Sequence, residues 1–286
     1  MSSPAPAEPS DPAASPPPEQ PPPGRGGLLP RWFPSPELAD LTGWWPLLGL
    51  RAQTDRLVLR PIADPDLPAL LAAVQSGIHP TGQNPFGEVP WSQAPAQDVA
   101  RQTLQHIWRS RAGTGPKTWA IQLGVWDRQG SSDGPTGGPD GALIGLQDLT
   151  AEDFHLTRTV QTGSWLRHSV QGHGLGKQAR AIGLTLAFDH LGALAAETSC
   201  ADWNQASQGV STALGYRFNG AHVRAWGRES VAELSFRLTP EDFRRPTTPV
   251  EVTGIDAVQR FLQISPTHQK TDVPTTAPSP SGETSP

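Results

Sequence analysis

Apolar positions along this chain follow two periods, and the alternation between them predicts a mixed fold. Leu57 and Leu59 alternate with their neighbours as in a strand, whereas Val99, Leu104 and Ile107 recur at helical spacing. The same patterns predict strands over 56–62, 118–126, 142–149, 157–168, 194–200, 216–223 and 231–238, and helices over 64–76, 97–111, 175–191 and 205–214. Strands interleaved with helices indicate an α/β domain built on a mixed sheet.

The two ends of the chain differ in composition from its middle. Residues 1–36 hold 13 of the 32 prolines and almost no aliphatic side chain before Leu28, which predicts a disordered Pro-rich arm. We expect a linker with an apolar extension over 37–51, one folded domain over 52–245, and a largely disordered tail over 246–286. Within the domain, residues 129–141 are rich in Gly, Ser, Asp and Pro, which predicts a mobile surface insertion.

Charge and composition narrow the classes of function. A net charge of −5 argues against nucleic acid as an electrostatic partner. The apolar stretch 41–50 contains glycine and proline and is too short to span a bilayer, so we expect no membrane partner. Cys200 is the only cysteine and no signal sequence is evident, which together predict a cytoplasmic protein. No His, Asp, Glu or Cys residues have metal-ligand spacing, so we expect no metal.

The most informative segment joins a predicted strand to a predicted helix. It reads Gln171-Gly172-His173-Gly174-Leu175-Gly176-Lys177, and we call it the glycine loop. Its glycines allow the main chain to approach a ligand closely. The first turn of the following helix offers unpaired N–H groups and the positive end of the helix dipole. The segment therefore predicts a phosphate-binding site.

Two common glycine-rich patterns do not fit this loop. A nucleoside-triphosphate P-loop would need Gly at 171 and Ser or Thr at 178, and both positions are glutamine. A dinucleotide fingerprint would need Gly-x-Gly-x-x-Gly. Gly172 and Gly174 fit its first two glycines, but the third glycine position is Lys177. The pattern that fits is Gln/Arg-x-x-Gly-x-Gly/Ala, with Gln171, Gly174 and Gly176.

Other motifs accompany this pattern in a fixed order. Gly163-Ser164-Trp165-Leu166 precedes the loop, Asn204-Gln205-Ala206-Ser207 follows it, and Leu214-Gly215-Tyr216 ends the next helix. With Arg56-Leu57-Val58-Leu59-Arg60-Pro61 as a first strand, these motifs resemble the Gcn5-related N-acetyltransferase (GNAT) superfamily over residues 52–245. The resemblance is closest to its Rim-type branch, the ribosomal-protein alanine acetyltransferases.

The resemblance implies a single GNAT-type domain, with a mixed, mostly antiparallel sheet flanked by helices, that binds acyl-coenzyme A (acyl-CoA), by default acetyl-CoA. In the family, the pyrophosphate lies against the glycine loop and the pantetheine lies along the preceding strand. The cofactor-binding residues expected here are Trp165, Leu166, Gln171, Gly172, Gly174, Leu175, Gly176, Lys177, Asn204 and Ser207. Asn204 would equally serve as a helix N-cap. Lys177 and Arg180 either face the polyanion or form a solvated helix face.

The resemblance also implies catalytic residues. Many relatives carry a tyrosine seven positions after the asparagine, which protonates the leaving thiolate; here that position is Ser211. The N–H of Leu166 is the expected oxyanion donor. Glu197 is the expected base, relaying the amine proton through water, or else a structural charge at a strand edge. Asp148 and His168 are lesser candidates.

The implied function is that of an N-acyltransferase. It moves an acetyl or other small acyl group from acyl-CoA to a primary amine by direct attack in a ternary complex. The glycine loop does not distinguish an acetyl from a succinyl donor, and the acceptor is a protein N-terminus or a small amine. A homodimer is a further expectation. Two alternatives stay open: a non-catalytic CoA-binding sensor on the same fold, because the tyrosine is missing, and a Pro-rich interaction protein.

Overall fold

The computed structural model describes residues 41–264, apart from 81, 88–89, 131–132 and 227–228; the predicted Pro-rich arm and residues 265–286 lie outside the described residues. All the predicted strands and helices are present. The strands are β1 (Arg51–Gln53), β2 (Leu57–Pro61), β3 (Thr118–Asp127), β4 (Gly137–Gly138), β5 (Gly141–Glu152), β6 (Thr159–Leu166), β7 (Ala195–Ala201), β8 (Arg217–Trp226), β9 (Glu229–Leu238) and β10 (Glu251–Thr253).

The helices fill the connections between these strands. The α-helices are α1 (Leu67–Gln75), α2 (Ala96–Ala112), α3 (Phe154–Thr157), α4 (Leu175–Thr185), α5 (Gln205–Leu214) and α6 (Ile255–Phe261). The 3-10 turns are η1 (Leu41–Gly43), η2 (Pro46–Gly49), η3 (Asp64–Asp66), η4 (Trp91–Gln93) and η5 (His168–Val170), and η6 (Leu186–His190) is π-helical. The helix predicted over 175–191 is thus α4 followed by a wider turn, in which the N–H of Leu191 donates to Leu186 O.

The strands form one sheet in the order β10-β1-β2-β3-β5-β6-β7-β9-β8, with β4 paired beside β5. Neighbouring strands are antiparallel except for β6 and β7, which are parallel. Because two parallel strands need a crossover connection, the helix α4 lies between them in the chain. The sheet is therefore mixed and mostly antiparallel, as predicted.

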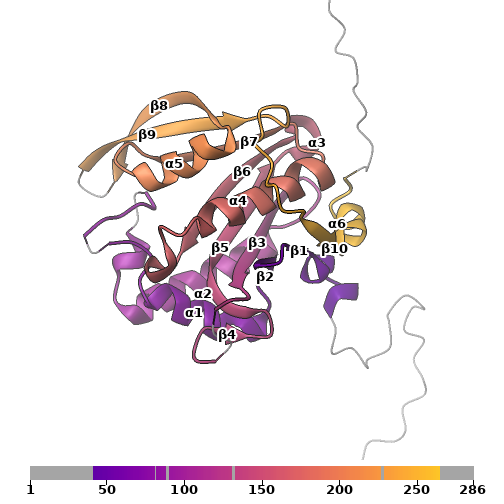
Figure 1. Ribbon diagram of the computed structural model, residues 1–286, viewed down its shortest axis with the longest axis horizontal. Coiled ribbons are helices and arrows are strands. Elements are labelled where there is room, and N and C mark those ends of the chain that lie inside the picture. Colours follow the sequence, from indigo (N-terminus) through magenta and orange to yellow (C-terminus); the bar gives the residue numbers. More distant parts are fainter. Residues whose placement is uncertain (1–40, 81, 88–89, 131–132, 227–228, 265–286) are drawn as a thin grey trace, which may run out of the picture. The chain divides into compact units, whose positions relative to one another are not determined.

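Helices cover both faces of the sheet (Figure 1). On one face α4 packs against a core that includes Leu59, Leu123 and Leu149, and we call this the α4 face. On the other, the α1/α2 face, α1 and α2 cover a second core that includes Val58 and Leu146. Successive strand residues point to opposite faces. In the middle of β5, odd-numbered residues therefore face α4 and even-numbered residues face α1 and α2.

The chain beyond residue 245 corrects one prediction. Residues 246–264 were expected in a disordered tail, but β10 pairs with β1 and α6 buries Val258 in the main core. Gly254 joins these two elements with a φ of +75°, and a Cβ at this residue would lie 2.1 Å from the carbonyl oxygen of Gly49. The two segments therefore approach closely because residue 254 has no side chain. The folded domain begins before residue 52 and extends to at least Ile264.

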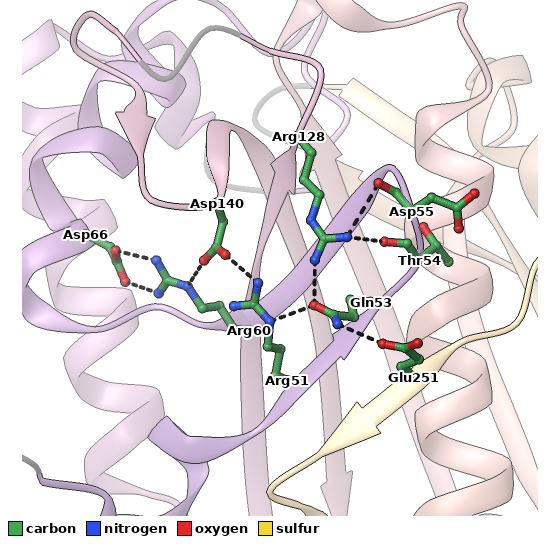
Figure 2. Close-up of polar contacts among 9 residues, drawn as sticks. All are labelled: Arg51, Gln53, Thr54, Asp55, Arg60, Asp66, Arg128, Asp140 and Glu251. Atoms are coloured by element: carbon green, nitrogen blue, oxygen red, sulfur yellow. Dashed lines mark hydrogen bonds and ion pairs between the residues drawn. The ribbon is translucent and has the colours of Figure 1, made fainter.

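A cluster of ion pairs links β1 and β2 to the turn before β5 at this edge of the sheet (Figure 2). Asp140 accepts hydrogen bonds from Arg51 of β1 and from Nε of Arg60 of β2, the latter at 2.8 Å. Arg60 also binds both carboxylate oxygens of Asp66 and stacks 4.5 Å above the Trp126 ring. Burial by itself would raise the pKa of Asp140, but the two arginines outweigh it and hold that pKa below its usual range.

This cluster also corrects the prediction of a mobile insertion over 129–141. Residues 137–138 form β4, which pairs with the start of β5, and a Cβ on Gly138 would lie 2.6 Å from the Trp126 ring. Asp140 holds the following turn against β1 and β2. The second half of the insertion is therefore packed on the domain.

Candidate functional site

The parallel strands β6 and β7 pair at one end only. Their ladder joins Thr159–Gln161 to Ala195–Glu197 and ends there. At its last rung, Thr198 Oγ1 donates to Thr162 O at 2.9 Å and Thr162 Oγ1 donates to Glu197 O at 3.2 Å. Beyond these threonines, residues 162–166 and 198–201 face each other without a ladder, and we call this region the β6–β7 opening. Along this opening the main-chain N–H groups of β6 have no ladder partner on β7.

The hydrogen-bonding pattern shows which residues of β6 face the opening. The N–H of Arg167 donates to Ile144 O of β5 at 2.8 Å. Because the direction of these groups alternates along an antiparallel strand, the N–H groups of Ser164 and Leu166 point away from β5, toward the opening. The N–H of Trp165 points to β5, and the Trp165 ring packs against the core of the α1/α2 face. The predicted main-chain contact of Trp165 is therefore wrong in direction, whereas that of Leu166 has the required orientation.

The glycine loop leads from β6 into α4 with its N–H groups uncommitted. Gly172 and Gly174 have φ values of +79° and +78°, and a Cβ on either would meet no atom within 4 Å. Among the described residues, no acceptor takes a hydrogen bond from the N–H groups of 172–177. The first intrahelical bond runs from Gln178 N to Gly174 O. This turn presents a set of free donors at the positive end of α4, with Lys177 exposed beside them.

Gln171 has a different role from the predicted one. Its Nε2 donates to Leu166 O at 2.8 Å and to Ile78 O at 2.9 Å, and its Oε1 lies 3.3 Å from Nδ1 of His168. Its main-chain N–H donates to His168 O. The side chain therefore fixes the loop against β6 and the segment after α1, and it uses His168 in the same network.

The helix α5 begins at the other side of the opening. Asn204 is its N-cap, accepting from the N–H of Ser207 at 3.1 Å, so the plain structural alternative is confirmed. Its Nδ2 has no acceptor among the described residues. Ser207 contacts the thiol of Cys200. Ser211, at the position of the family's tyrosine, is fully buried, and its hydroxyl donates its one proton to Ser207 O at 3.0 Å, which does not support a catalytic role as proton donor.

Arg180 lies in the second turn of α4 and is buried, with 4% of its surface exposed. Its Nη2 donates to Ser164 Oγ at 3.0 Å and its Nη1 donates to Ser211 Oγ at 3.1 Å, so it connects β6 to α5. Its Nε has no partner, and within the described part of the chain no carboxylate pairs with it. Burial lowers the pKa of this guanidinium. Of the two alternatives left open for Arg180, the solvated helix face is therefore wrong.

Glu197 lies where β6 and β7 are still paired, on the α1/α2 face. One carboxylate oxygen accepts from Gln161 Nε2 at 2.8 Å and the other forms an ion pair with Arg237. The side chain lines a cavity of about 630 Å³, whose wall also includes Arg109, Thr150, Glu152 and Gln161. Because both of its oxygens are engaged, Glu197 fits the alternative of a structural charge better than the predicted role of base.

Asp148, a lesser candidate for the base, lies in an environment that suits a general base better than that of Glu197. It is on the α1/α2 face of β5, opposite Gly163 of β6 and Gln122 of β3. Its Oδ1 is buried and has no hydrogen-bond partner among the described residues. Burial raises the pKa of Asp148 to about 7. A carboxyl group in this state exchanges a proton at neutral pH.

Other kinds of site are not found in the described part of the chain. No group of three or more His, Cys, Asp or Glu side chains there could hold a metal ion. No helix among the described residues is long and apolar enough to cross a bilayer.

Comparison with known proteins agrees with this architecture. Residues 56–217 match the acetyltransferase (GNAT) domain family. A GCN5-related N-acetyltransferase from Brucella melitensis is similar with a TM-score of 0.51 and 16% identity, over 67% of this chain and 79% of that one. A GNAT-family acetyltransferase from Bacillus anthracis has a TM-score of 0.50 and 14% identity, over 67% and 99%. An acetyltransferase from Salmonella typhimurium, which modifies the N-terminal serine of the ribosomal protein L7/L12, has a TM-score of 0.49 and 16% identity, over 65% and 96%.

Proposed function

The chain belongs to the acetyltransferase (GNAT) domain family and is an acyl-CoA-dependent N-acyltransferase, and we propose that the glycine loop and the β6–β7 opening bind the acyl-CoA while Asp148 accepts the proton of the amine. The observation that carries this proposal is the position of three features around one opening. Free N–H groups lie at its entrance, an oriented main-chain donor on its edge, and a carboxyl group with one buried, unpaired oxygen beside it.

The glycine loop fits a diphosphate. Its free N–H groups are aimed outward from a helix N-terminus, and the space beside Gly172 and Gly174 is open. A hydrogen bond to a charged acceptor contributes about 1.5–3 kcal/mol, so several such bonds offset part of the cost of binding. Lys177 adds a positive charge at the same place. Gln171 keeps the loop in this shape by holding Leu166 O and Ile78 O.

The opening supplies the remaining contacts of the donor substrate. Bound acyl-CoA brings an acyl group activated as a thioester, with acetyl as the proposed acyl group. The N–H of Leu166 is directed into the opening and stabilises the carbonyl oxygen as it gains negative charge. The free Nδ2 of Asn204 donates to the pantetheine arm from the other side.

Asp148 is the proposed base in place of Glu197. Its raised pKa means that a useful fraction is ionised at pH 7 while the group still binds a proton strongly enough to remove one from an attacking ammonium or amine. Gly163 leaves room for the amine next to the carboxyl group. Glu197 holds Gln161 and Arg237 at the closed end of the opening.

The acceptor is proposed to be the N-terminus of a protein or peptide. Thr150 lies two residues from Asp148 on the same face and lines the 630 Å³ cavity, so a chain whose amine reaches Asp148 can extend into it. Glu152 also lines that cavity and offers a carboxylate to a cationic acceptor. The sequence resemblance to the Rim-type branch supports the same class of acceptor.

An amine panel tests the proposal. Peptides with different N-terminal residues, small polyamines and aminoglycosides are incubated with acetyl-CoA or succinyl-CoA, and both thiol release and product mass are followed. We expect acetylated peptides, lost in Asp148→Asn and retained at reduced efficiency in Glu197→Gln. Release of thiol that does not depend on an amine, or an Asp148→Asn variant as active as the wild type, contradicts the assignment.

A further inference from the structure

Departure of coenzyme A leaves a negative charge on sulfur, and Ser211 stands at the position where many relatives carry the tyrosine that protonates it. The hydroxyl of Ser211 already donates to Ser207 O. The hydroxyl of Tyr216 is buried against Thr162 Oγ1, 2.9 Å away, at the closed end of the opening. Neither group is free to protonate the sulfur, and a positive charge beside the sulfur is the other way to stabilise a thiolate.

Arg180 carries a positive charge at this place. It is buried on the α4 face, and its two hydroxyl partners come from the two sides of the opening, Ser164 on β6 and Ser211 on α5. The titratable groups that face it are Tyr216 and Cys200. Burial raises the pKa of both, so both are neutral at pH 7 and no anion balances the guanidinium.

A buried cation without a counter-ion is costly in a folded protein, because desolvation is not repaid by a partner charge. Hydrophobic side chains of similar size would pack the same space more favourably. The uncompensated charge and the unpartnered Nε are thus complementary to an anion that is present only during turnover. The diphosphate is bound by the glycine loop, a full turn earlier, which leaves the thiolate as the anion within the opening.

We propose that Arg180 is the cationic group that stabilises the leaving thiolate of coenzyme A, in place of an acid that protonates it. The inference rests on the proposed acyl-CoA site. In the reaction, the amine nitrogen bonds to the thioester carbon and its proton passes to Asp148. The carbon–sulfur bond breaks, and its electron pair stays on sulfur as a thiolate beside the guanidinium. Ser164 and Ser211 position that guanidinium.

The state of the bound thiol tests this directly. The ultraviolet absorbance of the thiolate is titrated for coenzyme A bound to the full chain and for free coenzyme A, with the S-methyl-CoA complex as the blank for protein groups. The thiol of free coenzyme A resembles a cysteine, with a pKa of about 8.5. We expect the bound thiol to titrate at least about one unit lower, which means that coenzyme A gains about tenfold in affinity over S-methyl-CoA as the pH rises.

Two variants and one control assign the effect to Arg180. Arg180→Met should return the bound thiol to the pKa of free coenzyme A or above it, while Arg180→Lys should keep part of the shift. Arg245→Met is the matched control, since Arg245 pairs with Asp189 on the surface. Should Arg180→Met not fold, the wild-type titration and the affinity ratio decide.

The outcomes separate this inference from the proposed function. A wild-type complex in which the bound and free thiols have the same pKa overturns the role of Arg180, even if acyl transfer is normal. Equal weakening of coenzyme A and S-methyl-CoA by Arg180→Met also overturns it, because that pattern indicates a contact to another part of the molecule. No binding of either compound to the wild-type chain removes the acyl-CoA site itself.

Discussion

Asp148 and Gly163 lie directly opposite each other in the antiparallel ladder of β5 and β6, and the glycine leaves the carboxyl group without a side-chain neighbour across the ladder. A Cβ at residue 163 would have no atom within 4 Å, so the space is open. The pair therefore places a carboxyl group with one buried oxygen beside room for a second reactant.

The first prediction concerns the pH dependence of acyl transfer. With an acceptor amine that is neutral throughout the range, kcat/KM should rise about tenfold per pH unit below pH 7 and level off above it, because Asp148 has a pKa of about 7 and must be ionised to act as a base. Asp148→Asn should lose about 10²–10⁴ in kcat/KM and this pH dependence. Glu197→Gln serves as the control and should keep the wild-type midpoint; a midpoint that moves with Glu197 assigns the base to that residue.

The second prediction concerns stability. Asp148 has a folded-state pKa of about 7, whereas an unfolded aspartate has one of about 3.9. Below pH 4 both states bind the proton and the group costs nothing; as the pH rises from 4 to 7 the unfolded state loses the proton first, so stability falls. Asp148→Asn should therefore stabilise the protein by about 1–3 kcal/mol at pH 8 and by much less at pH 5. Urea denaturation at the two pH values measures this, and an equal effect at both would contradict it.

The third prediction concerns the glycine loop. Gly174→Glu should abolish coenzyme A binding, with an affinity loss of at least about 100-fold, because it places bulk and a negative charge beside the free N–H groups. Gly134→Glu is the matched control, since Gly134 has a similar φ of +88° and equally open surroundings but lies in the insertion after β3. Isothermal titration calorimetry on both folded variants compares them. Wild-type affinity in Gly174→Glu would exclude the loop as the phosphate site.

Local sequence patterns predicted the strands, the helices and the glycine loop because each of these depends on residues that are close in the sequence. The period of the apolar side chains sets each strand and helix, and the order of glycines before α4 sets the free N–H groups. These features depend on few contacts distant in sequence.

The parts that the sequence did not predict depend on distant contacts. Asp148 is a better candidate for the base than Glu197 because its neighbours on β3 and β6 leave its Oδ1 without a hydrogen-bond partner. Arg180 is buried because α5 packs over α4, a contact between segments about 30 residues apart that the spacing within α4 does not reveal. The segment 249–264 has no long run of regularly spaced apolar residues that would predict a strand. Its strand β10 has three residues and joins the sheet by pairing with β1.

The last prediction tests whether that C-terminal segment belongs to the folded domain. Gly254→Ala should destabilise the protein through two effects: a side chain in left-handed backbone costs about 1–2 kcal/mol, and the new Cβ would meet Gly49 O and push β10 and α6 away from η2. Gly134→Ala carries only the first cost, because a Cβ there has open space. The difference between the two variants, expected to be about 1–3 kcal/mol, isolates the close approach and should lower the melting temperature of Gly254→Ala by several degrees more. Equal melting temperatures would mean that the close approach of residue 254 to Gly49 contributes nothing to the stability of the sheet.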